Sequence, residues 1–147
     1  MKKFKKGLSL CEIFAILTIS IANIFLGGIK MKNNPRELLN DFTNGLQEAS
    51  ETSGAQVEAF MNLLGACYEP NALDVKTKEL ISVAVAAYNR CEYCIAFHVY
   101  KALESGASRN EIMEAAMVAV AFGGGPSMAY SVTLVKDSID EFEKDFQ

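Results

Sequence analysis

Apolar residues recur at intervals of three and four through nearly all of the chain after residue 31. Positions spaced in this way share one face of an α-helix, so the pattern predicts amphipathic helices. No segment sustains the alternation of apolar and polar residues that a half-buried strand requires. The pattern therefore predicts an all-α fold, a compact bundle of six helices over about residues 34–46, 53–65, 74–88, 91–105, 108–122 and 127–146.

Capping residues stand at several of the predicted helix starts. Asn34 precedes Pro35, and proline is favoured at the first position of a helix. Asp74 occupies the capping position before the third helix. Ser108 and Glu111 have the spacing of a capping box before the fifth. These residues strengthen the helical prediction because each can satisfy backbone N–H groups that a helix start leaves unpaired.

Glycine and proline mark the predicted helix ends. We expect the second helix to end near Gly65 and the fourth at Gly106, where glycine can adopt the left-handed conformation that stops a helix. The third is expected to break at Asn89–Arg90. The run Gly123–Pro126 is expected to end the fifth helix and to start the sixth.

The chain of 147 residues, half of them apolar, is long enough for one domain with its own core. The third and fifth predicted helices are rich in Ala, Val, Met and Ile on more than one face. A helix that is apolar nearly all round is usually buried on several sides. We therefore expect the domain to associate with further copies of itself.

The first thirty residues differ from the rest. Four lysines among residues 2–6 precede residues 7–29, a stretch whose one charge is Glu12. This pattern is typical of a signal peptide or signal anchor. An alternative is that translation starts at Met31. The prediction is a leader over residues 1–30 and a helical domain over residues 31–147. The protein is expected to be cytoplasmic if translation starts at Met31, and otherwise to be anchored in a membrane through residues 7–29.

The charge of the two segments has opposite sign. The whole chain carries a formal −4, which divides into +4 on residues 1–30 and −8 on residues 31–147. Phosphate backbones are bound by basic surfaces. An acidic helical domain is therefore not expected to bind nucleic acid.

Candidate chemistry is concentrated in the run C-x-x-C-x-x-x-H, formed by Cys91, Cys94 and His98, the one histidine of the chain. On a helix these three side chains form a continuous strip, so the two thiols can close a disulfide and His98 can accept the proton of Cys94. The helix N-terminus favours a thiolate near Cys91. Glu79, on the preceding helix, can reach the strip and fix the tautomer of His98.

Other interpretations of these residues are open. Cys91 and Cys94 could pack as small apolar residues, or they could bind zinc with His98, with Glu79 as the available fourth ligand. Taken alone, Glu79 is more often a solvated helix residue. Cys67, next to Tyr68 at a helix end, is expected to be structural. Three tyrosines are expected to be wall or packing residues: Tyr88, Tyr93 and Tyr100.

The order Glu79, eleven residues, Cys91-x-x-Cys94, three residues, His98 resembles the signature of the alkylhydroperoxidase D-like (AhpD-like) members of the carboxymuconolactone decarboxylase family. The similarity extends to residues 73–81 and 104–112 and covers about residues 36–145. It implies an all-α, AhpD-like oligomer, a trimer or hexamer. It also implies thiol-dependent reduction of hydroperoxides, or disulfide exchange, without a metal, flavin or haem.

The resemblance further implies residue roles: Cys94 as the attacking thiolate, Cys91 as the resolving thiol, and His98 with Glu79 as a proton relay. From the residues alone, the attacking thiolate could be either cysteine: the helix N-terminus favours ionisation of Cys91, and the histidine one turn further on favours ionisation of Cys94. We assign Cys94, because a local base should outweigh a partly screened dipole.

One position departs from the family pattern. Some members carry a second histidine just before the second cysteine, where this chain has Tyr93. Plain disulfide reduction becomes more plausible as a result. The expected reductant is an external dithiol, either a lipoyl group or a thioredoxin-like protein. Two alternatives are a carboxymuconolactone-type decarboxylase, for which paired thiols have no use, and a non-enzymatic redox sensor or zinc-binding module.

Overall fold

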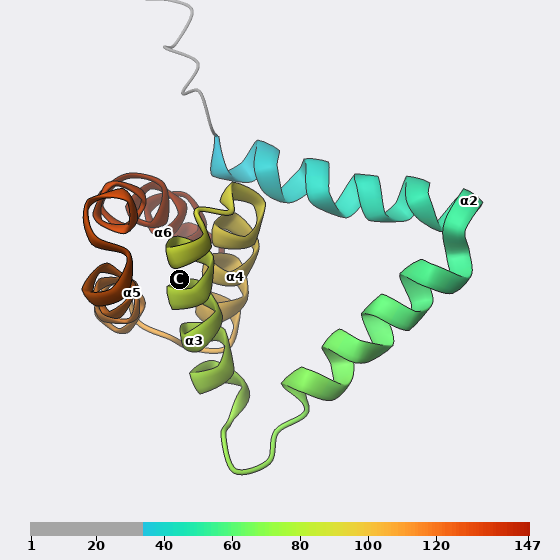
Figure 1. The fold of residues 1–147 in the computed structure, drawn as a ribbon, viewed down its shortest axis with the longest axis horizontal. Coiled ribbons are helices and arrows are strands. Elements are labelled where there is room, and N and C mark those ends of the chain that lie inside the picture. Colours follow the sequence, from blue (N-terminus) through green and yellow to red (C-terminus); the bar gives the residue numbers. More distant parts are fainter. Residues whose placement is uncertain (1–33) are drawn as a thin grey trace, which may run out of the picture. The chain divides into compact units, whose positions relative to one another are not determined.

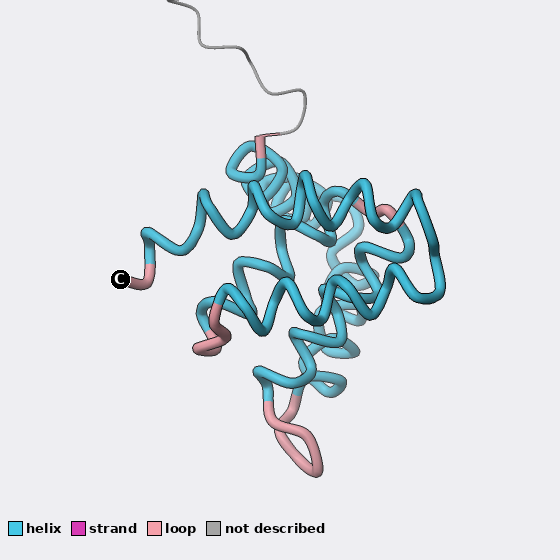
Figure 2. The backbone as a smooth tube through the Cα atoms, turned by 90° about the vertical axis from the view of Figure 1, so that its left-hand side faces the viewer, coloured by secondary structure: helices cyan, strands magenta, loops and turns pink. Residues whose placement is uncertain are grey.

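The computed structural model describes residues 34–147, and this part of the chain is almost entirely helical (Figures 1 and 2). The helices are α2 (Pro35–Tyr68), α3 (Val75–Asn89), α4 (Glu92–Glu104), α5 (Arg109–Tyr130), a π-helical turn (Ser131–Val135), α6 (Lys136–Phe142) and a final 3-10 turn (Glu143–Asp145). No strand occurs among these residues. The all-α prediction is therefore confirmed.

The predicted number of six helices is wrong. Residues 34–147 contain four continuous helical runs: α2, α3, α4, and a last run in which α5, the π-helical turn and α6 follow one another without a break. Two of the predicted boundaries are bends within a run. One lies at Ser53, with φ −134° and ψ 39°, and the other at Gly124, with φ 59° and ψ −143°.

The predicted caps form. The Asn34 side chain accepts from the backbone N–H of Arg36 and Glu37, and the Asp74 side chain accepts from that of Thr77. Ser108 and Glu111 make a reciprocal capping box. Gly106, at φ 80°, follows the end of α4 as expected.

The C-terminal end of α2 differs from the prediction. The helix continues through Gly65 to Tyr68 and is capped at Glu69. Glycine lowers helix stability without ending a helix unless its conformation turns left-handed. In Figure 1, α2 turns near its middle, and its second half runs back toward the start of α3.

The core lies among α3, α4, α5 and α6, with α4 packed against the other three and α3 against α5. α2 adds only Pro35 and Leu38 as buried residues. Ala86 and Ala87 on α3 and Ala96 and Ala102 on α4 are buried completely or nearly so, which brings the helix backbones close together. Phe142, Ile95 and Ile112 are fully buried. A side chain of this size contributes about 1.5–3 kcal/mol when it is buried rather than exposed.

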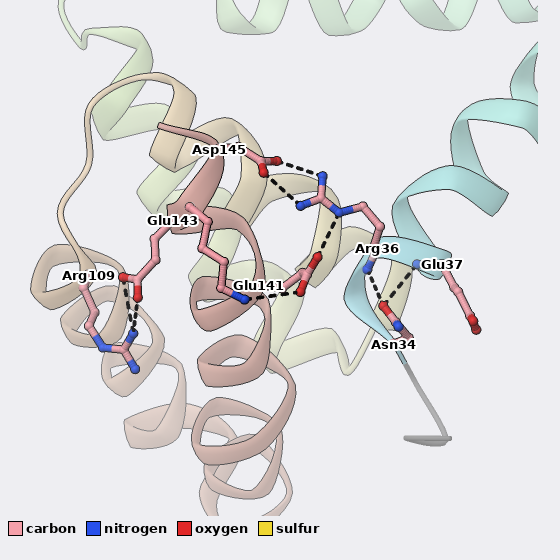
Figure 3. Close-up of polar contacts among 8 residues, drawn as sticks. Asn34, Arg36, Glu37, Arg109, Glu141, Glu143 and Asp145 are labelled. Atoms are coloured by element: carbon pink, nitrogen blue, oxygen red, sulfur yellow. Dashed lines mark hydrogen bonds and ion pairs between the residues drawn. The ribbon is translucent and has the colours of Figure 1, made fainter. Parts of the chain in front are cut away.

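A charged cluster ties the start of α2 to the C-terminal end of the chain (Figure 3). Arg36 Nε lies 3.0 Å from Glu141 Oε1, and Arg36 Nη1 lies 2.7 Å from Asp145 Oδ2. The guanidinium also lies over the ring of Phe142, 4.8 Å from its centroid. This contact fixes the first turn of α2 on the core, although α2 buries few apolar side chains.

Within the described residues, the run Arg109–Asp145 is the one helical stretch that is long and apolar enough to cross a membrane by length and composition. Of its most apolar window, 28% is buried inside the protein. Core helices and membrane spans both pass this test, so the run is compatible with either a soluble or an anchored protein. The predicted leader over residues 1–30, and with it the anchor over 7–29, lies outside the described residues.

Candidate active site

Glu79 and His98 form the polar centre of the site. Glu79, in the first half of α3, is 4% exposed, and its Oε2 lies 2.8 Å from Nδ1 of His98 on α4. The interpretation of Glu79 as a solvated helix residue is therefore wrong. When Nδ1 donates its hydrogen to the carboxylate, the lone pair of a neutral imidazole is on Nε2. The contact thus prepares Nε2 to accept a proton.

The two cysteines lie at the start of α4. Cys91 is the N-cap residue, and Cys94 stands in the first turn with its Cα atom 5.2 Å from that of Cys91. A disulfide joins the two sulfurs, and the backbone N–H of Cys94 donates to Cys91 Sγ over 3.3 Å. The short link at Arg90, which adopts φ 57°, places this helix start directly after the end of α3.

An apolar cavity of about 510 Å³ adjoins the cysteine pair. Cys94, His98 and Glu79 all line it, whereas Cys91 is not among the lining residues. Most of the wall is apolar and comes from α2 and α4, and it includes Phe42, Phe60, Met61, Leu64 and Phe97. The wall also includes Lys101, which pairs with Glu104. Cys94 therefore borders a space suited to an apolar molecule.

Tyr68 and Ser82 belong to the same site, although sequence reasoning assigned neither residue to it. The Tyr68 ring, at the end of α2, stacks on the His98 ring with centroids 5.9 Å apart and planes 14° apart. Tyr68 Oη forms a hydrogen bond with Ser82 Oγ and lies 3.5 Å from His98 Nδ1. The available signal was the spacing of Ser82, which lies three residues after Glu79 and therefore on the same face of α3.

The pKa of Tyr68 is shifted by this environment. Partial burial raises it above the ordinary value for tyrosine, and the charge of nearby Glu79 acts in the same direction, while the hydrogen bond with Ser82 opposes the shift. The phenol of Tyr68 therefore keeps its proton at neutral pH. It can donate to a neighbour, and its oxygen can still accept.

The other singled-out residues contribute less to this geometry. Tyr93 is 47% exposed and lies at the edge of the cavity, and Tyr88 is 50% exposed on the surface between α3 and α5. Tyr100 packs against Phe142 and Phe146. Cys67 is a free, exposed cysteine. Among residues 34–147, no group of three His, Cys, Asp or Glu side chains is arranged to hold a metal ion.

Sequence comparison finds one family over the site. Residues 56–137 match the sequence model of the carboxymuconolactone decarboxylase family. The "uncharacterized protein 4 in cox locus" of Paracoccus denitrificans is 38% identical over 97 residues, which are 65% of this chain and 87% of that protein. An uncharacterized protein of Cupriavidus necator is 28% identical over 101 residues, 69% of this chain and 89% of its own length.

Solved structures lead to the same family. A carboxymuconolactone decarboxylase family protein from Legionella pneumophila superposes with a TM-score of 0.69 at 31% identity, over 79% of this chain and 100% of that one. A family protein from Thermotoga maritima reaches a TM-score of 0.61 at 29% identity, over 74% and 96% of the two chains. The description of the Thermotoga protein suggests an antioxidative response for it.

Proposed function

The chain belongs to the carboxymuconolactone decarboxylase family, and from that membership and the site geometry we propose that it is a thiol-dependent oxidoreductase that reduces hydroperoxides. The arrangement that supports this activity most directly is a Cys91–Cys94 pair whose Cys94 lines the same cavity as the Glu79–His98 contact. The antioxidative response suggested for the Thermotoga relative agrees with it. No metal or organic cofactor is required for the chemistry below.

In the first step His98 accepts the proton of Cys94, and the thiolate attacks the terminal oxygen of the hydroperoxide. A sulfur–oxygen bond forms as the oxygen–oxygen bond breaks, so the sulfur is oxidised and the peroxide reduced by two electrons. The leaving alkoxide takes the proton from His98 and departs as an alcohol. Glu79 stabilises the intermediate imidazolium through its bond to Nδ1.

In the second step the Cys91 thiol attacks the sulfenic acid on Cys94, a disulfide forms, and the hydroxyl leaves with the thiol proton as water. In the third step an external dithiol exchanges with the disulfide. That dithiol returns two electrons and two protons and becomes a disulfide itself. A lipoyl group or a thioredoxin-like protein has suitable chemistry for this reduction.

The lining of the cavity supports Cys94 as the attacking residue. Cys94 borders the space in which a peroxide would bind, together with His98, whereas Cys91 is the N-cap and lies outside the lining. The backbone N–H of Cys94 donates to Cys91 Sγ, which suits a resolving thiol held close to its partner. The helix N-terminus still favours a thiolate at Cys91, so it assists the second step.

The cavity wall supports an organic hydroperoxide rather than hydrogen peroxide as the substrate. Phe60, Met61 and Leu64 present apolar surface, which gains free energy when it contacts an apolar body. We expect a lower KM for cumene hydroperoxide than for hydrogen peroxide. Met61→Glu should remove that preference while hydrogen peroxide reduction continues.

Disulfide exchange is a second candidate, and Tyr93 is the observation that favours it. Family members with a histidine at this position have a second base beside the attacking cysteine, and Tyr93 cannot serve as such a base near neutral pH. If that second base is needed to cleave a peroxide, the Cys91–Cys94 dithiol of this chain would instead reduce small disulfides. Tyr93→His should then raise peroxide turnover.

We also propose that the chain forms a homo-oligomer, a trimer or hexamer. Large apolar side chains outside the cavity are exposed on α2 and on the face shared by α3 and α5, namely Leu63, Ile81, Val85, Val118 and Phe122. Exposed apolar patches of this kind commonly mark protein interfaces. Light scattering at micromolar concentration should give a mass above that of the monomer, and a strictly monomeric result would contradict this proposal.

A thiol count combined with peroxide consumption tests the proposed function. The test uses the full chain with Cys67→Ser, because Cys67 is an exposed thiol outside the pair. Peroxide should remove two thiols per chain, and an added dithiol should restore them with continued turnover. Oxidation without turnover would assign the pair to a sensor, and turnover with a disulfide substrate alone would assign it to a reductase.

A further inference from the structure

We propose that Tyr68 is a positioning residue for His98, which it holds in the orientation and tautomer that the thiol chemistry needs; this role rests on the function proposed above. Tyr68 reaches the site from the end of α2, thirty positions before His98. Its ring covers one face of the imidazole, with centroids 5.9 Å apart and planes 14° apart. The ring of Phe97 stands nearly perpendicular to the same imidazole, with centroids 5.2 Å apart and planes at 87°. The imidazole is thus enclosed by aromatic rings on two sides.

The donor and acceptor of each hydrogen bond around Tyr68 can be assigned from the bond that Ser82 makes to the backbone. Ser82 Oγ lies 2.9 Å from the carbonyl oxygen of Lys78. Because a carbonyl oxygen can only accept, the single hydroxyl hydrogen of Ser82 is donated to it. In the Tyr68–Ser82 bond, Ser82 must therefore accept and Tyr68 must donate. The lone pairs of Tyr68 Oη remain available to a further donor.

That further donor is the Nδ1–H of His98. It faces Glu79 Oε2 at 2.8 Å and Tyr68 Oη at 3.5 Å. The carboxylate takes the short bond, and the phenol oxygen is a second, more distant acceptor near the same nitrogen. Two acceptors at Nδ1 keep the hydrogen on this nitrogen. The basic lone pair is then on Nε2, where the thiol chemistry requires it.

The backbone around Tyr68 is fixed to the same helix that carries Glu79. Lys78 Nζ lies 2.8 Å from the carbonyl oxygen of Cys67 and 2.6 Å from that of Glu69, the two neighbours of Tyr68. A cation that bonds the carbonyls at a helix C-terminus also stabilises the helix dipole. Lys78 therefore joins the end of α2 to α3 beside Glu79, and this connection gives Tyr68 a defined position over His98.

The histidine itself provides the readout, because it is the only one in the chain. Long-range nitrogen–proton NMR spectra of the full chain show one imidazole, and its two nitrogen shifts report the tautomer. We would record them from about pH 5 to 9, a range that includes the usual titration of histidine. Tyr68→Leu removes both ring and hydroxyl, Tyr68→Phe removes the hydroxyl alone, and Tyr88→Phe is a matched control outside the site.

We expect Tyr68→Leu to convert part of the neutral imidazole to the Nε2–H form and to lower kcat for peroxide reduction about tenfold, as the loss of base positioning commonly does. Tyr68→Phe should change the tautomer ratio in the same direction by a smaller amount. Unchanged nitrogen shifts in both variants, relative to Tyr88→Phe, would overturn the positioning role. If Tyr68→Leu does not fold, the shifts of Tyr68→Phe decide the question.

The two readouts separate this role from the proposed function. A tautomer change in a protein that consumes no peroxide would support the positioning of His98 and contradict the peroxidase activity. A loss of kcat with unchanged nitrogen shifts would mean that Tyr68 acts through the shape of the cavity, and the positioning role would then be wrong.

Discussion

The Nδ1 atom of His98 lies 2.8 Å from Oε2 of Glu79, although nineteen positions of the chain separate the two residues. The contact exists because α3 and α4 pack against each other with a very short link between them. It places a carboxylate that is almost completely buried against an imidazole that is 18% exposed and borders the cavity. One end of this pair is thus shielded from water while the other can meet a substrate.

Glu79→Gln should slow the oxidation of Cys94 by about tenfold or more, within the range found when a general base loses its support. Glutamine keeps the size and an acceptor oxygen but cannot stabilise the imidazolium that forms when His98 takes the thiol proton. Stopped-flow measurement of a single turnover with excess peroxide follows the step directly. Glu114→Gln, an exposed carboxylate on α5, makes the same change in charge and should leave the rate unaltered. An equal rate in Glu79→Gln and wild type would remove the relay from the mechanism.

Cys91→Ser should stop the reaction after the first step, with a sulfenic acid left on Cys94. Dimedone should then label Cys94, and mass spectrometry of the peptide should find the adduct. Cys94→Ser should consume no peroxide and form no adduct at Cys91, because Cys91 does not border the cavity. The reverse pattern, with an adduct at Cys91 only, would exchange the two roles.

Replacing two glycines by alanine should change the free energy of unfolding in opposite directions. Gly124 has φ 59° and ψ −143°, a conformation that strains any residue with a Cβ atom, so Gly124→Ala should cost about 1–3 kcal/mol of unfolding free energy. Gly45 lies in the first half of α2, and a Cβ atom there meets no other atom within 4 Å. Gly45→Ala should therefore stabilise the protein by about 0.5–1 kcal/mol. Urea unfolding followed by circular dichroism measures both, and destabilisation by Gly45→Ala would show that this site is not an ordinary exposed helix position.

Glu111 should make the stability depend on pH in the acid range. Its pKa is lowered from the ordinary value of 4.5 to about 2, first by the backbone N–H of Ser108 and then by the ammonium of Lys76. A carboxyl whose pKa falls on folding stabilises the folded state above its unfolded pKa and loses that contribution as the pH falls toward its folded pKa. Glu111→Gln should therefore be less stable than wild type at neutral pH, and the difference should shrink between about pH 4.5 and 2.

Urea unfolding curves at a series of pH values check this dependence, with Glu114→Gln as the control for the loss of one exposed charge. A difference between wild type and Glu111→Gln that stays constant down to the lowest pH would contradict the pairing with Ser108 and Lys76.

Helix boundaries were predictable where a cap or a conformation depends on one residue. Asn34, Asp74 and Ser108 cap helices because their short side chains accept from the next backbone N–H groups, and this chemistry is local. Gly106 ends α4 for an equally local reason. The boundary at Gly65 was misjudged, because a glycine allows a helix to end without requiring it. At Gly123–Pro126 the predicted break is a bend at Gly124 within a continuous helical run.

The candidate site was predictable in part for a related reason. Cys91 caps α4, and Cys94 and His98 lie within it, so their spacing alone brings the three residues to the first two turns of one helix. Glu79 could be named as a partner from its distance along the chain and from the family resemblance. Tyr68 could not be named in this way, because its place over His98 depends on the length of α2 and on the contacts of Lys78 with the end of that helix.

The sequence by itself determined the all-α class, the caps and the place of two cysteines and a histidine at the start of one helix, since each follows from periodicity or from interactions within a few residues. Only the tertiary structure decided that Glu79 is buried against His98, that Cys94 rather than Cys91 borders the apolar cavity, and that Tyr68 stacks on the imidazole. These relationships join residues on different helices, and the packing of whole helices, rather than local spacing, sets the distances between them.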